Sequence, residues 1–417
     1  MSGLTDLLAA TAARTPCATA VAESGHELTY ASLWADSGRL AHCLRGEQLT
    51  GQTVVLAVLP GIRWITALLG VWRAGAVALP VDLAQPYEHL ARITSGCRAR
   101  AALTHTGKPL RWAPSLRTMP VSVNSDRGAE PLLPGSPSDD TPAYIWHGGI
   151  PARPCPLVVT HRALAARANA VPHLAGISRA DRVAQLAPVT AEAVLWEVLC
   201  ALVTGARLEI AGPFNRTPGP PRAGFLERHV ITAFTCTFDE LVATPYVSLS
   251  KLRRIVLRGG DPDLPALARW LGRYDVAAAY GVPETCGDAL FAGNLRESDD
   301  PAPIGWPLPG VLAWVLDERQ RPVPRGEPGE LYLGGDALAI GYPRRTLRRT
   351  EATGAFVRLH LPPPNDPQGS TADVRLYRTR DRVLIQDNGQ YVVLGHLSRI
   401  SAAPGGVFVR RPADQPR

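Results

Sequence analysis

Two glycines near the middle of the chain, Gly148 and Gly149, have the setting of a phosphate-binding loop. An apolar stretch that predicts a strand, residues 143–146, precedes them, and a second one, residues 157–159, comes before a segment of helical character. Glycine accepts the dihedral angles that turn successive amides toward one anion. The span HGGIPARPCP, residues 147–156, contains no serine, threonine or lysine, and its three prolines have no N–H to donate. An ordinary proline-rich turn therefore stays open as the alternative.

The composition limits the classes of protein to consider. With 417 residues and 46% hydrophobic content, the chain can bury a large core and should divide into two or three lobes. Its 44 basic and 37 acidic residues give a net charge of +7, but the basic residues are spread out and nearly all are arginine. Nothing in this pattern predicts a nucleic-acid partner. Only Lys108 and Lys251 are available for chemistry that needs a lysine.

The cysteines and the N-terminus indicate a reducing compartment. The seven cysteines are widely spaced and form no C-x-x-C pair, which favours neither a zinc site nor a disulfide framework. The N-terminus lacks the charged and apolar regions of a signal peptide, and no window is apolar enough to span a bilayer. We therefore expect a cytoplasmic protein without a membrane partner.

Hydrophobic spacing predicts alternating helices and strands through the first third of the chain. The pattern predicts helices at 4–13, 31–44 and 65–74, a hairpin around residues 24–26, and strands at 53–59, 76–81 and 101–104. Such alternation is typical of a doubly wound α/β lobe, here residues 1–135. Residues 109–141 are rich in proline, serine, glycine and aspartate, and we interpret them as a connection between lobes.

The same alternation predicts a second α/β lobe at residues 136–300. From Pro301 the pattern changes to short strands separated by glycine turns, which predicts a small antiparallel β unit at residues 301–397. Residues 398–417 are rich in proline, and we expect only a short tail there.

Several stretches together carry a family resemblance that covers almost the whole chain. They are residues 28–33 (LTYASL), 72–82 (WRAGAVALPVD), 195–197 (LWE), 280–284 (YGVPE), 303–307 (PIGWP), 329–335 (GELYLGG), 338–342 and 377–381 (YRTRD). In this order they resemble the N-terminal core of an adenylate-forming enzyme, specifically the amino-acid adenylation domain of nonribosomal peptide synthetases.

This resemblance implies a two-step reaction that uses ATP and Mg²⁺. A carboxylate attacks the α-phosphorus of ATP, which gives an acyl adenylate and pyrophosphate, and the acyl group then moves to a pantetheine thiol on a carrier protein. By resemblance Asp381 binds the ribose hydroxyls, Tyr280 stacks on the adenine, and Glu284 helps to hold the magnesium ion. The phosphates would face the glycine loop, where Gly148 and Gly149 offer amides and Arg153 offers charge.

The chain also departs from the pattern of that family. Cys155 stands at the position of the loop lysine, Pro283 replaces the usual threonine before Glu284, and Ala278 replaces an asparagine. Each lost donor that faces developing charge typically costs about 10² to 10³ in rate. The hinge position that usually holds an aspartate is Ser398, and neither lysine of the chain matches a family lysine. We therefore expect the C-terminal lid domain to be absent from this sequence.

The resemblance also predicts an amino-acid pocket. Its residues are Glu192, Ala193, Trp196, Leu257, Gly259, Ala279 and Gly287. Glu192 takes the position of an aspartate that pairs with the α-ammonium of the substrate, so it indicates an amine ligand. The alternative is a solvated glutamate at a helix start, where negative charge suits the helix dipole. His147 and His161 are not interpreted as a catalytic pair, because the family often has a histidine at the position of His161, which favours a structural role.

Two functional hypotheses follow. The first is a degenerate adenylation-like protein without catalysis that serves a natural-product assembly line through contacts with a carrier protein, an intact adenylation enzyme or a small MbtH-like protein. The second is an amino-acid-activating ligase whose lid domain comes from another polypeptide.

Overall fold

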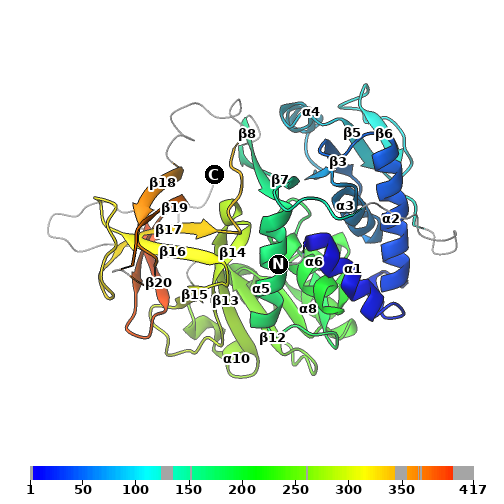
Figure 1. Ribbon diagram of the computed structural model, residues 1–417. Helices are drawn as coiled ribbons and strands as arrows, with labels where there is room; N and C mark the ends of the chain where they lie inside the picture. The colour runs from blue at the N-terminus through cyan, green and yellow to red at the C-terminus, as the bar shows by residue number, and fades with distance from the viewer. Residues whose placement is uncertain are drawn as a thin grey trace.

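The computed structural model describes residues 3–123, 135–150, 153–259, 262–342, 355–364, 366 and 369–397, with the backbone alone for residues 148–150 and 153–155. The expected tail at 398–417, including Ser398, lies outside these ranges. In the described part, two β-sheets and the helices packed on them form two α/β lobes, and antiparallel strands extend one of the sheets (Figure 1).

The first sheet has six strands. Its order is β6 (Arg117–Pro120), β5 (Ala101–Thr104), β3 (Thr53–Ala57), β4 (Val77–Pro80), β7 (Pro142–Ile150) and β8 (Arg153–Thr160). All neighbours are parallel except β7 and β8. The central strands β3, β4 and β5 are buried except at Thr53, and they are apolar apart from Thr53 and Thr104, as expected for a buried parallel sheet.

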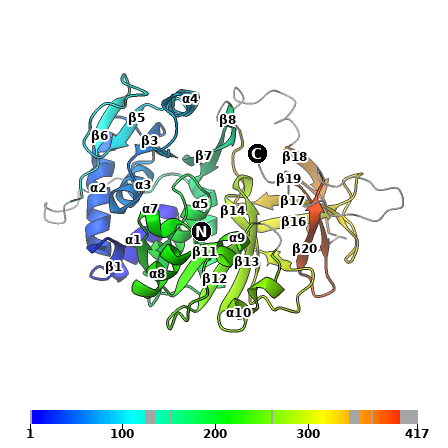
Figure 2. The same cartoon turned by 180° about the vertical axis from the view of Figure 1, so that it is seen from behind.

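The second sheet has fourteen strands. Its parallel part contains β1 (Thr19–Glu23), β10 (Arg207–Ile210), β9 (Arg182–Gln185), β11 (Ala233–Cys236), β12 (Arg254–Arg258) and β13 (Asp275–Val282), with β2 (His26–Thr29) antiparallel at the edge. Its antiparallel part contains β14 (Gly287–Ala292), β15 (Pro303–Pro307), β16 (Val311–Leu316), β17 (Gly329–Gly335), β18 (Phe356–Leu361), β19 (Ala372–Ile385) and β20 (Tyr391–His396). Figure 2 shows β16–β20 at the end of the molecule opposite to β5 and β6.

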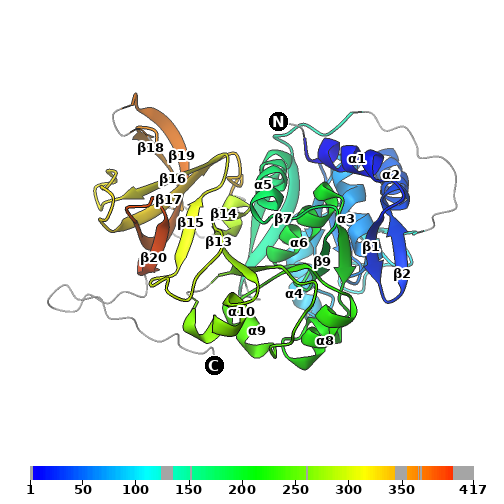
Figure 3. The ribbon, with the colours of Figure 1, turned by 90° about the horizontal axis from the view of Figure 1, so that it is seen from below.

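The helices between the sheets build the main core. The helices are α1 (Leu4–Arg14), α2 (Tyr30–Gly46), α3 (Ile62–Ala74), α4 (Tyr87–Gly96), α5 (His161–Leu174), α6 (Ala193–Thr204), α7 (Pro213–Arg216), α8 (Pro220–Arg228), α9 (Phe238–Ala243) and α10 (Ala268–Leu271), with the 3₁₀ turns η1 (Pro265–Leu267) and η2 (Pro283–Thr285). The largest apolar cluster takes buried side chains from both sheets and from α1, α2, α3, α5 and α6 (Figure 3).

The structure corrects the prediction of a glycine loop at Gly148 and Gly149. Gly148 and Gly149 directly precede Ile150, the last residue of β7, and their backbones pair with Cys155 and Pro154 of β8. Successive N–H groups of a strand point to opposite edges, whereas a phosphate loop turns successive amides toward one anion. The prediction failed because a glycine pair is compatible with both a loop and an extended hairpin, and sequence does not choose between them.

Sheet membership does not follow the predicted boundary between residues 135 and 136. The hairpin of β1 and β2 joins the second sheet through β10, while β7 and β8 complete the first sheet. Parallel pairing brings together strands that are distant in sequence, so lobe limits cannot be inferred from chain order alone. The limits of the lobes stay a prediction. None of the described helices is long and apolar enough to cross a membrane.

Candidate functional site

The residues predicted for the amino-acid pocket lie together where α6 begins beside β12, β13 and β14. Glu192 precedes the first residue of α6, and Ala193 and Trp196 are on its first turn. Leu257 and Ala279 are buried on neighbouring parallel strands. Gly259 follows β12 with φ +66°, and Gly287 begins β14. The order of the strands places the ends of β12, β13 and β14 next to one another, and the role of these residues as an amino-acid pocket stays a prediction.

Glu192 is not a free acceptor in this pocket. One carboxylate oxygen accepts from Arg167 of α5 and the other accepts from Arg258 at the end of β12. Burial disfavours ionisation of Glu192, but the two guanidinium groups outweigh it and hold the pKa of this carboxyl below its usual range. The alternative of a solvated glutamate is wrong, because the side chain of Glu192 is only 17% exposed.

A second carboxylate completes a network of four charges. Asp288 of β14 accepts from Arg258, and its Oδ2 lies 3.4 Å from Arg167 Nη2. Arg167 also donates to the backbone oxygen of Cys286. The side chains of Arg167 and Asp288 are 1% and 0% exposed. Two positive and two negative charges therefore compensate one another in a buried position, which we call the charge network (Arg167, Glu192, Arg258 and Asp288).

The charge network requires a glycine at position 287. A Cβ at this position would lie 1.6 Å from Arg167 Nη1 and 1.7 Å from Glu192 Oε1. The residue also has φ +91°, which side chains rarely adopt. Both observations mean that only glycine lets Arg167 reach Glu192 here.

Three members of the charge network were missed by sequence reasoning. Arg258 stands between the predicted Leu257 and Gly259, and Asp288 directly follows the predicted Gly287, so their neighbours gave a signal. Arg167 lies among the buried, mostly apolar residues of α5, and its direct neighbours in the sequence do not indicate a buried charge. A charged residue on the apolar face of a predicted helix would have been the only clue.

The residues assigned to the nucleotide lie at the junction of β13 with the antiparallel strands. Tyr280 of β13 donates its phenolic hydrogen to the carboxylate of Asp381 on β19. Burial raises the pKa of Asp381, and the hydrogen bond from Tyr280 opposes this shift. Burial beside this carboxylate also raises the pKa of Tyr280 well above its ordinary value.

Glu284, the residue assigned to the magnesium ion, also accepts a hydrogen bond from a tyrosine. It lies in η2 and is buried, and its carboxylate accepts from the hydroxyl of Tyr342. Burial and the Glu284 carboxylate both raise the pKa of Tyr377. The two acidic groups assigned to ribose and magnesium each accept a hydrogen bond from a tyrosine, which leaves further acceptor positions on both carboxylates. Their roles toward a nucleotide and Mg²⁺ therefore stay predictions. Within the described ranges, no three histidine, cysteine, aspartate or glutamate side chains are grouped to hold a metal ion.

The histidines beside the hairpin support the fold. His147 Nε2 lies 2.7 Å from the backbone oxygen of Pro80, and burial lowers the pKa of its ring. His161 begins α5, and its burial lowers the ring pKa to about 4. Neither ring contacts the charge network, in agreement with a structural role. The side chain of Arg153 lies outside what the structure describes.

Comparisons with known proteins identify the family to which this chain is similar. The model of the AMP-binding enzyme family matches residues 8–343. One of the subunits of linear gramicidin synthase from Brevibacillus parabrevis is 32% identical over 389 residues, which are 92% of this chain and 5% of that protein. The chain thus spans a small part of the length of this relative.

Solved structures agree on the fold. NpsA-ThdA, an artificially fused Adenylation-PCP di-domain of a nonribosomal peptide synthetase from Klebsiella oxytoca, has a TM-score of 0.80 at 23% identity and covers 96% of this chain and 80% of that one. The N-terminal subdomain of Klebsiella oxytoca NpsA in complex with 3-hydroxybenzoyl-AMSN has a TM-score of 0.79 at 23% identity, with coverage of 95% and 100%. The chain belongs to the AMP-binding enzyme family and has the fold of the N-terminal core of a nonribosomal peptide synthetase adenylation domain.

Proposed function

We propose that this protein is a non-catalytic, adenylation-like member of its family that serves a natural-product assembly line through protein contacts. The observation that carries the proposal is the charge network, which occupies the amino-acid pocket with the protein's own arginines. An amine substrate would have to displace Arg167 or Arg258 from Glu192. The exchange replaces one charged hydrogen bond to Glu192 by another, and it leaves the displaced arginine in a buried position with Asp288 as its remaining partner in the charge network. The exchange is therefore unfavourable.

The region expected to hold the nucleotide supports the same proposal. The ladder between β7 and β8 stands where the family has its phosphate loop, and Cys155 takes the lysine position there. Asp381 and Glu284 accept hydrogen bonds from Tyr280 and Tyr342. With a cysteine in place of the loop lysine, the negative charge that develops in adenylate formation would have fewer cationic groups to stabilise it.

One observation favours the second candidate, an amino-acid-activating ligase with a lid in trans. Tyr280, Glu284 and Asp381 are all present and lie at the same end of β13, as a nucleotide site of this family would require. A substrate with its own carboxylate besides the reacting one could also exchange partners with Arg258. The two candidates differ in a measurable reaction, amino-acid-dependent exchange of pyrophosphate into ATP.

The first experiment is calorimetry with ATP and Mg²⁺, followed by the exchange assay with the twenty amino acids and a lid domain from an intact relative. We expect weak or no heat and no exchange. Asp381→Ala is the informative variant, and Asp373→Ala, on the same strand with a side chain 77% exposed, is the matched control. Exchange that survives in the control and disappears in Asp381→Ala would establish the ligase and refute our proposal.

The partner side of the proposal needs its own measurement. The fused neighbour NpsA-ThdA joins an adenylation domain to a PCP, which makes a carrier protein the first partner to test. An intact adenylation enzyme and an MbtH-like protein from the same gene neighbourhood are the others. We expect sedimentation velocity to detect a complex with at least one of these three purified proteins. Sedimentation of every mixture as separate components at about 50 μM, well above common working affinities, would contradict a role through these contacts.

A further inference from the structure

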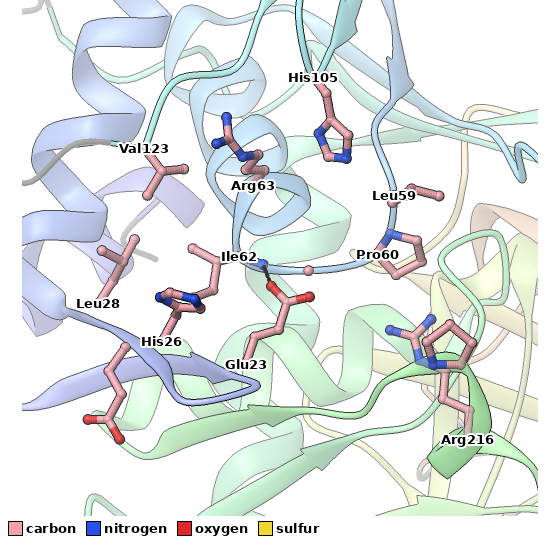
Figure 4. A pocket seen from close by; sticks show the side chains of 13 residues that line it. Glu23, His26, Leu28, Leu59, Pro60, Ile62, Arg63, His105, Val123 and Arg216 are labelled. Carbon is pink, nitrogen blue, oxygen red and sulfur yellow. Dashed lines mark hydrogen bonds between the residues drawn. The ribbon is translucent and has the colours of Figure 1, made fainter.

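A pocket of about 650 Å³ lies away from the charge network, between the first sheet and the edge of the second (Figure 4). Its size is within the range of about 300 to 1,000 Å³ that is typical of small-molecule sites. The residues lining it are Glu23, His26, Glu27, Leu28, Leu59, Pro60, Gly61, Ile62, Arg63, His105, Val123, Pro213 and Arg216. None of these belongs to the sites described above.

The pocket lies where the topology of an open α/β sheet favours ligand binding. Strand β3 leads through α3 to β4 on one side, while β5 lies on its other side and leads to β6, so the direction of winding reverses between β3 and β5. Ligands bind at the carboxyl ends of the strands at such a reversal. Leu59, Pro60 and Gly61 follow β3, and His105 follows β5.

The second sheet contributes the carboxyl ends of two more parallel strands. Glu23 is the last residue of β1, and Arg216 ends α7, which follows the neighbouring strand β10. The pocket is therefore enclosed by the ends of four strands from two sheets. This position, and not any single helix terminus, marks it as a binding site.

One wall carries a negative charge that the fold holds in place. Glu23 Oε2 accepts from the amide of Ile62 at 2.9 Å, at the beginning of α3. A Cβ on Gly61 would lie 2.6 Å from both carboxylate oxygens, so the glycine lets Glu23 approach the helix. The other oxygen, Oε1, has no hydrogen-bond donor among the residues that the structure describes, so it can accept from a donor in the pocket.

The facing wall carries a positive charge that is also held. Arg216 donates through Nε to Ala211 O and through Nη2 to Gln185 Oε1, both at 2.8 Å. Its Nη1 makes no hydrogen bond to any residue that the structure describes, and Figure 4 shows the guanidinium turned toward Glu23 across the pocket. Burial lowers the pKa of Arg216, and Glu23 is among the groups that oppose this shift. A guanidinium with two of its nitrogens anchored is preorganised for a carboxylate.

The remaining lining sets the character of the ligand. Leu28, Leu59, Ile62, Val123 and two prolines give the pocket apolar surface between its charged walls. Burial, together with Arg63, lowers the pKa of His105, so this ring is a neutral hydrogen-bonding group near pH 7. A polyphosphate would meet the carboxylates of Glu23 and Glu27, which disfavour it by repulsion.

We infer that this pocket binds a small zwitterion with an apolar body, an α-amino acid or a short peptide. The ammonium of the ligand lies against Glu23, its carboxylate lies against Arg216, and its side chain contacts the apolar lining. This site is independent of the charge network, so it stands whether or not the protein activates an amino acid.

The test is calorimetry of the full chain with L-leucine and with the dipeptide leucyl-leucine. Two analogues act as ligand controls: 4-methylpentanoate, which lacks the ammonium group, and 3-methylbutylamine, which lacks the carboxylate. We expect at least one of the two zwitterions to bind, and each analogue to bind at least about tenfold more weakly because one charged wall is then left unpaired. No heat with either zwitterion at about 10 mM would overturn the proposal, and so would equal binding of an analogue.

Variants locate the binding. Glu23→Gln keeps an oxygen for the Ile62 amide but removes the charge, and Arg216→Gln removes the guanidinium. We expect both to lose at least about tenfold in affinity for the bound zwitterion, while Glu88→Gln and Arg92→Gln, in the exposed part of α4, keep it. A thermal unfolding curve for each variant shows that it is folded. Unchanged affinity in both pocket variants would place the ligand elsewhere and refute the assignment.

Discussion

The guanidinium of Arg258 binds the carboxylate of Glu192 across the space between the end of β12 and the beginning of α6. Arg167 binds the same carboxylate from α5, so the acidic group expected to meet an amine substrate is already paired twice. The residues of the charge network therefore form a closed set of charges. The predictions below test the strength of that set and of its surroundings.

Replacing Arg167 by leucine should destabilise the protein strongly. The variant leaves two buried carboxylates with one arginine, and breaking a buried pair in this way costs about 3 to 5 kcal/mol. The measurement is the free energy of unfolding in urea. Arg117→Leu is the control, because its pair with Glu47 is exposed and contributes less than about 1 kcal/mol. Equal losses in the two variants would show that the charge network is not formed.

Gly287→Ala should be destabilising by about 2 to 4 kcal/mol. The methyl group would overlap Arg167 and Glu192, and φ +91° is strained for alanine. Gly293→Ala is a matched control, because a Cβ there meets nothing within 4 Å. Urea unfolding measures the free energy of unfolding of both variants. A Gly287→Ala protein as stable as the control would contradict the described position of Arg167.

The buried carboxyl of Glu197 should make stability depend on pH. Burial raises its pKa to about 7, while Leu186 and Ala187 donate backbone hydrogens to it at 2.9 and 3.0 Å. Between the ordinary pKa of 4.5 and 7, the folded state binds more protons than the unfolded state, so stability falls as pH rises.

Glu197→Gln removes this titration and keeps an oxygen for the two amides. We expect the stability of Glu197→Gln relative to the parent to increase by roughly 2 to 3 kcal/mol from pH 5 to pH 8. Urea midpoints at the two pH values measure it. A difference between the two proteins that does not change with pH would mean that Glu197 ionises normally in the folded protein.

Tyr280→Phe should raise the pKa of Asp381 further. Burial raises the pKa of Asp381, and the hydrogen bond from the tyrosine hydroxyl lowers it. Without this hydrogen bond, the pKa should therefore rise. Titration of aspartate carboxyl carbons by NMR follows the change. Tyr391→Phe, whose hydroxyl bonds a backbone oxygen 3.3 Å away, is the control that should leave Asp381 unmoved. An unchanged Asp381 titration in Tyr280→Phe would show that the hydrogen bond is absent in solution.

Local sequence determined the elements of the α/β lobes and the antiparallel unit, because apolar periodicity and glycine turns report on single strands and helices. Residues 53–57 and 77–80 are strands within the predicted ranges, and α3 ends at Ala74, as predicted. The family also followed from motifs that lie far apart in the chain, and Glu192 and Gly287, both predicted for the pocket, lie side by side.

Only the tertiary structure decided what those residues do for one another. Arg258 and Asp288 stand next to residues predicted for the pocket, but nothing in the sequence indicates that they join Arg167 and Glu192 in one network. Whether a buried carboxylate faces a ligand or an arginine depends on distances between elements, which strand pairing and helix packing set. For the same reason the pocket of Glu23 and Arg216 was invisible in the sequence, since it requires the carboxyl ends of strands from two sheets to lie side by side.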